Sequence, residues 1–250
     1  MLTKIECTLC ENIFGRYCVP KSSQHRPACQ ELLRGGVWEL ETIDFIRRHA
    51  GDRDIVHAGT YFGDFLPGLA SALASGRTIY GFEPNPENYT AAQWTAVLNA
   101  LTNVRLTNAG LGAERKGTFM RIASTGRKGA WWRFSHRQPR RKALGGGSQI
   151  VDDWSAAPPN DGGVSPIRLV TLDDALPLTA DVGILQLDVE GYEASALMGG
   201  LQTIQRCRPI IIVETVPTAF VAEYLVPLGY SHTETICENS VFTPQTVDAA

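Results

Sequence analysis

Residues 54–89 (DIVHAGTYFGDFLPGLASALASGRTIYGFEPNPENY) constrain the fold more than any other segment of the chain. A short apolar run leads into a turn that carries Gly59 and Gly63, and bulky apolar side chains then recur at the spacing of one helix face. A second apolar run, residues 78–82, ends at Glu83. This order of strand, glycine turn, helix, strand and acidic residue predicts a doubly wound α/β sheet that binds a nucleoside cofactor.

The glycine turn and Glu83 are expected to contact different parts of such a cofactor. Glycines at a strand–helix turn let the backbone approach a ligand closely. A carboxylate that ends the next strand can accept hydrogen bonds from both hydroxyls of a ribose. The turn reads G-x-x-x-G and lacks the third glycine of a dinucleotide fingerprint, which favours S-adenosylmethionine, a cofactor without phosphate. The alternative is an ordinary turn followed by an incidental surface glutamate.

Length and composition fit one soluble α/β domain. The chain has 250 residues, of which 44% are hydrophobic and 20% charged, and its formal net charge is −3. No apolar run reaches the length of a membrane span, and residues 1–14 lack the continuous apolar core of a signal peptide. We therefore expect a cytoplasmic protein whose cysteines are thiols. The expected domains are an N-terminal extension with a leading helix (1–50) and a Rossmann-like domain (51–250) with a basic insert at about 125–150.

Four of the six cysteines lie near the N-terminus: Cys7, Cys10, Cys18 and Cys29. Cys7 and Cys10 have the two-residue gap of a zinc knuckle, but a strong zinc signature needs two such pairs and the chain has one. Buried or incidental thiols are the favoured interpretation.

Strands are expected to alternate with helices along the rest of the chain. The expected helices cover residues 37–48, 86–99, 192–205 and 217–227. The expected strands cover residues 103–112, 116–122, 182–187, 209–213, 230–236 and 239–243. This alternation predicts a mostly parallel sheet with an antiparallel edge.

Residues 127–142 (RKGAWWRFSHRQPRRK) form a basic insert with seven basic and no acidic residues. Because the formal net charge is −3 overall and +7 in this insert, the rest of the chain has a formal net charge of −10. Its interleaved aromatic residues suit an anionic acceptor, a sugar phosphate or a nucleic acid. The glycine run 145–147 favours a mobile lid. A solvated loop whose aromatic residues pack on the domain is the alternative, and the acidic remainder argues against nucleic acid as a partner.

The chain resembles the FkbM-type family of S-adenosylmethionine-dependent methyltransferases. The matching segments are IVHAGTYFGDF, YGFEPNPENY, NVRLTNAGLG, LVTLDDAL, ILQLDVEGYEASALMGG and RPIIIVE, in the family's order over residues 35–216. The segments SSQHRPA and VWELETIDFI are similar to the leader seen in part of the family. The resemblance implies a class I methyltransferase fold and O-methylation, often of sugar hydroxyls on glycans or natural products.

The motif and the resemblance together define a set of expected cofactor-binding residues. They are Glu39, Thr42, His57, Ala58, Gly59, Thr60, Gly63, Glu83, Pro84, Asn85, Leu111 and Asp188. One departure concerns His57, because the family usually has an aspartate there that supports the methionine amino group. His57 can still contact the cofactor, but the sequence leaves its role open.

Asp188 is the leading candidate for catalysis. It ends the strand at 182–187, beside the expected methyl position, with Glu190 two residues on and Glu214 at the next strand end. A carboxylate there can orient the acceptor hydroxyl and accept its proton. Asp188 and Glu214 could instead hold Mg²⁺, or Asp188 and Glu190 could cap the following helix. His25 is a second candidate base, with a plain surface histidine as the alternative.

Two other functions remain open from the sequence. A nicotinamide-dependent sugar oxidoreductase is weakened by the missing glycine and by the lack of a Tyr-x-x-x-Lys pair. A non-catalytic nucleic-acid-binding module would use the basic insert. The sequence does not identify the acceptor, the metal dependence or whether the protein forms a homo-oligomer.

Overall fold

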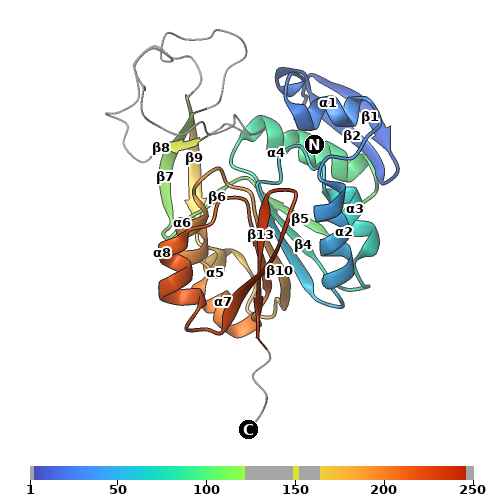
Figure 1. The fold of residues 1–250 in the computed structure, drawn as a ribbon. Coiled ribbons are helices and arrows are strands. Elements are labelled where there is room, and N and C mark those ends of the chain that lie inside the picture. Colours follow the sequence, from blue (N-terminus) through green and yellow to red (C-terminus); the bar gives the residue numbers. More distant parts are fainter. Residues whose placement is uncertain (1–2, 122–148, 152–163, 246–250) are drawn as a thin grey trace, which may run out of the picture.

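The computed structural model describes residues 3–121, 149–151 and 164–245, so the basic insert at 127–142 lies outside the described residues. A seven-stranded sheet forms the centre of the fold (Figure 1). Its strands lie in the order β12 (Tyr230–Ile236), β13 (Asn239–Pro244), β11 (Ile210–Val213), β10 (Val182–Leu187), β3 (Asp54–Ala58), β4 (Ile79–Phe82), β5 (Val104–Thr107). The five strands from β11 to β5 are parallel, and β13 pairs antiparallel with both β11 and β12. The predicted Rossmann-like, doubly wound sheet with an antiparallel edge is confirmed.

Alternating side chains along the strands build one core on each face of the sheet. On one face, Ile55 and Ile184 pack with residues of α2 (Leu40–His49) and α3 (Leu66–Ala72). On the other, Val56 and Leu185 pack with α5 (Leu172–Ala175), α6 (Glu193–Met198), α7 (Leu201–Cys207) and α8 (Thr218–Phe220). Figure 1 shows these two helix layers on either side of the sheet. Within the described ranges, no helix is both long and apolar enough to cross a membrane.

A second, smaller sheet lies beside the first. It has the order β6 (Gly110–Leu111), β9 (Val164–Val170), β7 (Lys116–Arg121), β8 (Gln149–Val151). Because β7 and β8 flank the undescribed segment 122–148, the basic insert leaves and rejoins the described chain at this sheet.

The N-terminal extension is a hairpin of β1 (Cys7–Asn12) and β2 (Gly15–Pro20), a 3₁₀ turn (Lys21–Ser23) and α1 (Pro27–Leu33). It packs on α4 (Pro86–Leu98), where the Cys18 N–H donates to Thr95 Oγ1 at 3.2 Å. A buried cluster joins Tyr17 of the extension to Phe62 of the glycine turn and Ala91 of α4. The extension therefore covers the turn, while the domain boundary near residue 50 stays a prediction.

The six cysteines are free thiols in the structure. Burial raises the pKa of the Cys18 thiol, and it raises the pKa of Cys29 to about 12.

Three predicted elements differ from the structure. The helix predicted over 192–205 is two helices, α6 and α7, because the backbone leaves the helical conformation at Gly200 (φ −117°, ψ 12°), and two adjacent glycines weaken a helix. The strand predicted over 103–112 is split into β5 and β6, because the Asn108 side chain turns the chain by donating to the Glu83 carbonyl at 2.8 Å. The helix predicted over 217–227 is α8 followed by a π-helical turn, Val221–Leu225.

Candidate active site

A cavity lies where the strand order of the large sheet reverses. From β3 the chain continues to β4 and β5 on one side, whereas β10 pairs with the other edge of β3. Crevices at the carboxyl ends of strands beside such a switch point are the usual ligand sites of open α/β sheets. The cavity encloses about 300 Å³ and is lined from β3, β4, β10, the smaller sheet and the N-terminal extension.

Ten of the predicted site residues line this cavity. They are Glu39, His57, Ala58, Gly59, Glu83, Pro84, Asn85, Leu111, Asp188 and Glu190. The structure therefore brings together residues that are as many as 151 positions apart in the sequence (from Glu39 to Glu190).

The other predicted residues lie behind the wall or away from it. Thr42 donates to Glu39 Oε2 at 3.1 Å, and Thr60 donates to the His57 carbonyl at 2.8 Å, so both hold lining residues in place. Gly63 packs against α4, where an added Cβ would lie 3.3 Å from Ala92 Cα. His25 is exposed and is not among the residues that line the cavity.

The glycine turn brings two strand ends close together. Gly59 has a φ of 83°, which favours glycine, and a Cβ there would collide with the Asp188 carbonyl oxygen. The Gly59 N–H donates to the Phe82 carbonyl at 3.0 Å and the Asp188 N–H to the Ala58 carbonyl at 3.0 Å. The turn thus sets the spacing between the ends of β3, β4 and β10.

Glu83 is buried at the carboxyl end of β4. Its Oε2 accepts a hydrogen bond from the Tyr61 N–H and its Oε1 one from the Asn85 N–H, both at 2.8 Å. Burial raises the pKa of Glu83 to about 7, and the two backbone hydrogen bonds oppose this shift. Each carboxylate oxygen has a second lone pair, so Glu83 can brace the turn and still accept a ligand hydroxyl.

His57 presents an unsatisfied nitrogen at the cavity wall. Its Nδ1 is hydrogen bonded to Gln186 Oε1, and its ring stacks on Phe65 with centroids 5.2 Å apart. Nε2 is buried and has no hydrogen-bond partner within the described part of the chain. Burial lowers the pKa of His57 to about 4, so the ring is neutral near pH 7. With the Nδ1 proton donated to the Gln186 oxygen, Nε2 is a free acceptor.

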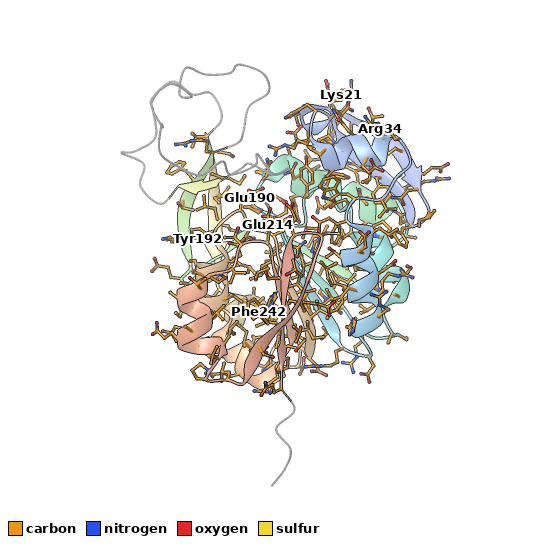
Figure 2. The ribbon with its side chains drawn as sticks, in the orientation of Figure 1. Lys21, Arg34, Glu190, Tyr192, Glu214 and Phe242 are labelled. Carbon is orange, nitrogen blue, oxygen red and sulfur yellow. The ribbon has the colours of Figure 1, made fainter. Side chains whose placement is uncertain are left out.

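Asp188, Glu190 and Glu214 form a carboxylate cluster at the ends of β10 and β11. One carboxylate oxygen from each lies within 4.8 Å of the others, and Figure 2 shows the labelled Glu190 and Glu214 close together above the sheet. Burial raises the pKa of Asp188 well above its usual range, and the charge and hydrogen bond of Glu214 raise it further. Tyr192 is the N-cap of α6 and its side chain makes no cap hydrogen bond, while the capping role of Asp188 and Glu190 stays a prediction.

The cavity wall is predominantly acidic. Its carboxylates belong to Glu39, Asp64, Glu83, Glu87, Asp188 and Glu190, against one arginine, Arg26. Burial raises the pKa of Asp64 to about 7 and also raises the pKa of Glu39. A cationic ligand would stabilise the ionised forms of these groups, whereas an anionic one would oppose them.

Strained backbone also gathers here. Three non-glycine residues with positive φ line the cavity, namely Glu39 (48°), Tyr61 (52°) and Glu190 (54°). Such conformations cost roughly 1–3 kcal/mol each and concentrate at functional sites.

Sequence reasoning missed several lining residues, of which Arg26, Asp64 and Gln186 carry the most chemistry. Gln186 had a signal, because it is a lone polar residue inside the apolar run 182–187. Arg26 had no such sequence signal, because its position in the cavity depends on how the N-terminal extension packs against the Rossmann-like domain.

Fold and cavity together define a Rossmann-like domain built to bind a nucleoside cofactor. The family described as the methyltransferase FkbM domain matches residues 57–232. The chain therefore belongs to the FkbM methyltransferase family, which confirms the predicted class, an S-adenosylmethionine-dependent methyltransferase.

Solved structures that are similar to this chain have low sequence identity to it. A methyltransferase FkbM from Methylobacillus flagellatus is 14% identical, with a TM-score of 0.48 over 77% of this chain and 43% of that protein. The Pyrococcus abyssi tRNA (uracil-54, C5)-methyltransferase, solved with S-adenosylhomocysteine, is 10% identical, with a TM-score of 0.48 over 96% of this chain and 44% of that one. This chain thus spans less than half the length of both proteins. No match was found among curated protein sequences.

Proposed function

We propose that this chain is an O-methyltransferase that transfers the methyl group of S-adenosylmethionine to a hydroxyl of a sugar, glycan or natural product. The observation that carries the proposal is the acidic cavity at the switch point, with six lining carboxylates and one arginine. S-adenosylmethionine carries a sulfonium and an ammonium, and this wall is complementary to both charges. The pyrophosphate of a nicotinamide cofactor would face the same carboxylates, which disfavours the oxidoreductase.

The residues present fit the cofactor. Glu83 would accept hydrogen bonds from the ribose hydroxyls, Leu111 would contact the adenine, and the Gly59 turn would let the backbone approach the cofactor closely. His57 Nε2, buried and without a partner among the described residues, would accept a hydrogen bond from the methionine ammonium. In this assignment the neutral histidine takes the place of the family's aspartate, and Glu39 supplies negative charge close by.

When bound, the cofactor supplies a methyl group already activated by the sulfonium. What the protein adds is alignment, exclusion of water and removal of the acceptor proton. Asp188 is the proposed base, because it lies at a strand end on the cavity wall. Burial and the neighbouring Glu214 raise the pKa of Asp188, so its carboxylate, when ionised, is a stronger base than that of an ordinary aspartate and can receive the proton of the hydroxyl.

A divalent cation is the alternative role for the carboxylate cluster. The oxygens of Asp188, Glu190 and Glu214 are close enough to ligate one ion such as Mg²⁺, which would lower the pKa of the acceptor hydroxyl. Dialysis against EDTA separates the two roles. Full turnover without metal supports Asp188 as the base, and turnover restored only by Mg²⁺ supports the metal site.

The anionic character of the acceptor rests on sequence alone, because the basic insert lies outside the described residues. The seven positive charges of residues 127–142 would bind the negative group of an anionic sugar. The proposed location of this reaction is the cytoplasm.

Calorimetry combined with an acceptor screen tests the proposed function. S-adenosylmethionine and S-adenosylhomocysteine should bind, and NAD should not. Methyl transfer to at least one sugar-hydroxyl acceptor should then be detected by mass spectrometry. Binding of NAD with no binding of S-adenosylhomocysteine would refute the proposal.

A further inference from the structure

Arg26 is the single lysine or arginine among the described residues that line the cavity. Its guanidinium makes no ion pair and no hydrogen bond with any described residue, although it is partly buried. Every other charged side chain in the described wall is a carboxylate. Arg26 is therefore the one place in this wall where a negative ligand group meets a positive charge.

The backbone holds Arg26 firmly at this position. Its N–H donates to the Ser23 carbonyl at 2.9 Å, and its own carbonyl accepts from the Gln30 N–H at 2.9 Å. Pro27, the first residue of α1, keeps Arg26 in an extended conformation (φ −80°, ψ 145°). The Arg26 side chain therefore extends from a backbone position that is fixed at the start of α1.

Arg26 immediately precedes α1, which contacts the glycine turn through Cys29 and Tyr61. The positive charge of Arg26 acts to lower the pKa of both Tyr61 and Cys29, against the larger effect of burial. Those two side chains contact each other, with Cys29 Sγ 3.2 Å from Tyr61 Oη. Since Tyr61 belongs to the turn that carries Gly59, Arg26 lies at the end of the cavity where the turn faces the extension.

We propose that Arg26 binds the α-carboxylate of the cofactor. This inference rests on the proposed function, because S-adenosylmethionine and S-adenosylhomocysteine each carry one carboxylate, which the six acidic side chains of the wall would repel. A planar guanidinium can pair with a carboxylate through two parallel hydrogen bonds. Arg26 would thus fix the amino-acid end of the cofactor from the N-terminal extension.

The test is calorimetry with two ligands that differ in this carboxylate. One is S-adenosylhomocysteine and the other is its decarboxylated analogue, S-adenosyl-3-thiopropylamine. Arg26→Gln should weaken S-adenosylhomocysteine binding by roughly 10-fold or more and change binding of the analogue by less than about 2-fold. Arg26→Lys should recover part of the loss, because it restores the charge without the planar fork.

Arg34→Gln is the matched control. Arg34 caps the far end of α1, is exposed and does not line the cavity, and Figure 2 labels it on the outer part of the extension. This variant removes the same charge from the same helix and should bind both ligands like the parent protein.

Two results would overturn the inference while leaving the proposed function intact. One is an equal loss of affinity for both ligands in Arg26→Gln. The other is unchanged binding of both ligands, including the case in which only the KM of an acceptor rises. Failure of the parent protein to bind S-adenosylhomocysteine would instead refute the proposed function.

Discussion

The Glu83 carboxylate accepts a hydrogen bond from the Tyr61 backbone N–H at 2.8 Å, and so ties the end of β4 to the glycine turn. Its other oxygen holds the Asn85 N–H, at the start of α4. One buried side chain therefore positions the turn, the helix start and the proposed ribose contact together.

Replacing Glu83 should weaken cofactor binding and loosen the turn. Glu83→Ala removes the hydrogen bonds to the ribose, each worth about 1–3 kcal/mol if the buried hydroxyls are left unpaired. It also leaves the Tyr61 and Asn85 N–H groups without their acceptor, so the melting temperature should fall as well. Calorimetry and thermal melting measure the two effects. Glu11→Ala, which changes an exposed glutamate that does not line the cavity, is the control. Unchanged affinity in a folded Glu83→Ala variant would remove Glu83 from the site.

Asp188→Asn should abolish most turnover while the protein stays folded and binds S-adenosylhomocysteine. The asparagine keeps the shape of the side chain but cannot accept the hydroxyl proton, and general-base catalysis typically contributes 10²–10⁴-fold. Single-turnover rates with an identified acceptor measure this loss, and circular dichroism checks the fold. A variant that keeps the full rate would exclude both the base and the metal-ligand role.

His57 should remain neutral from pH 8 down to about pH 5, with the proton on Nδ1. Burial lowers its pKa to about 4, and the Gln186 oxygen faces Nδ1. Nitrogen-15 NMR of the labelled imidazole reports the tautomer, and S-adenosylhomocysteine should shift the Nε2 signal. Protonation near pH 6.5, or a proton on Nε2 in the free protein, would contradict the proposed acceptor role.

The stability of the ligand-free protein should fall as the pH rises from about 6.5 to 8. Burial raises the pKa of Asp64 and Glu83 to about 7, from ordinary values of 3.8 and 4.5. The folded state thus binds more protons than the unfolded chain, and the stabilisation present at low pH is lost as these carboxyls ionise. The lowered pKa of His57 acts in the opposite sense, but mainly below pH 6.5, where an unfolded histidine takes up a proton.

Urea unfolding at several pH values tests this slope. Asp64→Asn should flatten the dependence between pH 6.5 and 8, because the amide does not titrate. Asp52→Asn, which changes an exposed carboxylate in the turn before β3, should leave the slope unchanged. Stability that stays constant or rises across this window in the parent protein would contradict the raised pKa values of Asp64 and Glu83.

Neutralising the basic insert should raise the acceptor KM and leave cofactor binding nearly unchanged. The variant replaces Arg133, Arg137, Arg140 and Arg141 with glutamine. The parent protein should lose acceptor affinity as salt increases, since the Debye length falls from about 10 Å at 0.1 M to about 3 Å at 1 M. Equal kinetics for parent and variant at low salt would make residues 127–142 an ordinary surface loop.

The sequence predicts the central sheet well because each strand carries its own signal. The apolar runs 54–58 and 182–187 become β3 and β10, and Asn85 with Pro86 starts α4 as expected, with Asn85 Oδ1 accepting from the Glu87 N–H at 2.9 Å. The break between α6 and α7 was missed because the prediction rested on helix periodicity, although the adjacent Gly199 and Gly200 are a local signal for the end of a helix.

The residues of the candidate site also fall into a predicted group and a missed group. Glu83 and Asp188 were predicted because each ends an apolar run, where parallel strands place ligand contacts. Arg26 was missed because its neighbour Tyr61 lies 35 positions along the chain, and only tertiary packing brings them together. Local sequence patterns therefore predict the site residues at the strand ends. They do not predict the residues that the N-terminal extension contributes to the cavity, because those depend on tertiary packing.

The packing of the extension on α4 has a kinetic consequence. Ser23, Arg26 and Ala28 form one wall of the cavity, and that wall is held by contacts such as the bond from the Cys18 N–H to Thr95 Oγ1 and those between Arg16 and Asn99. We predict that a ligand held between this wall and the strand ends leaves faster when the packing of the wall on α4 is weakened. The residence time of the cofactor should therefore depend on how often the hairpin and α1 detach, and mutations at the Arg16–Asn99 contact, outside the cavity wall, would change dissociation rates.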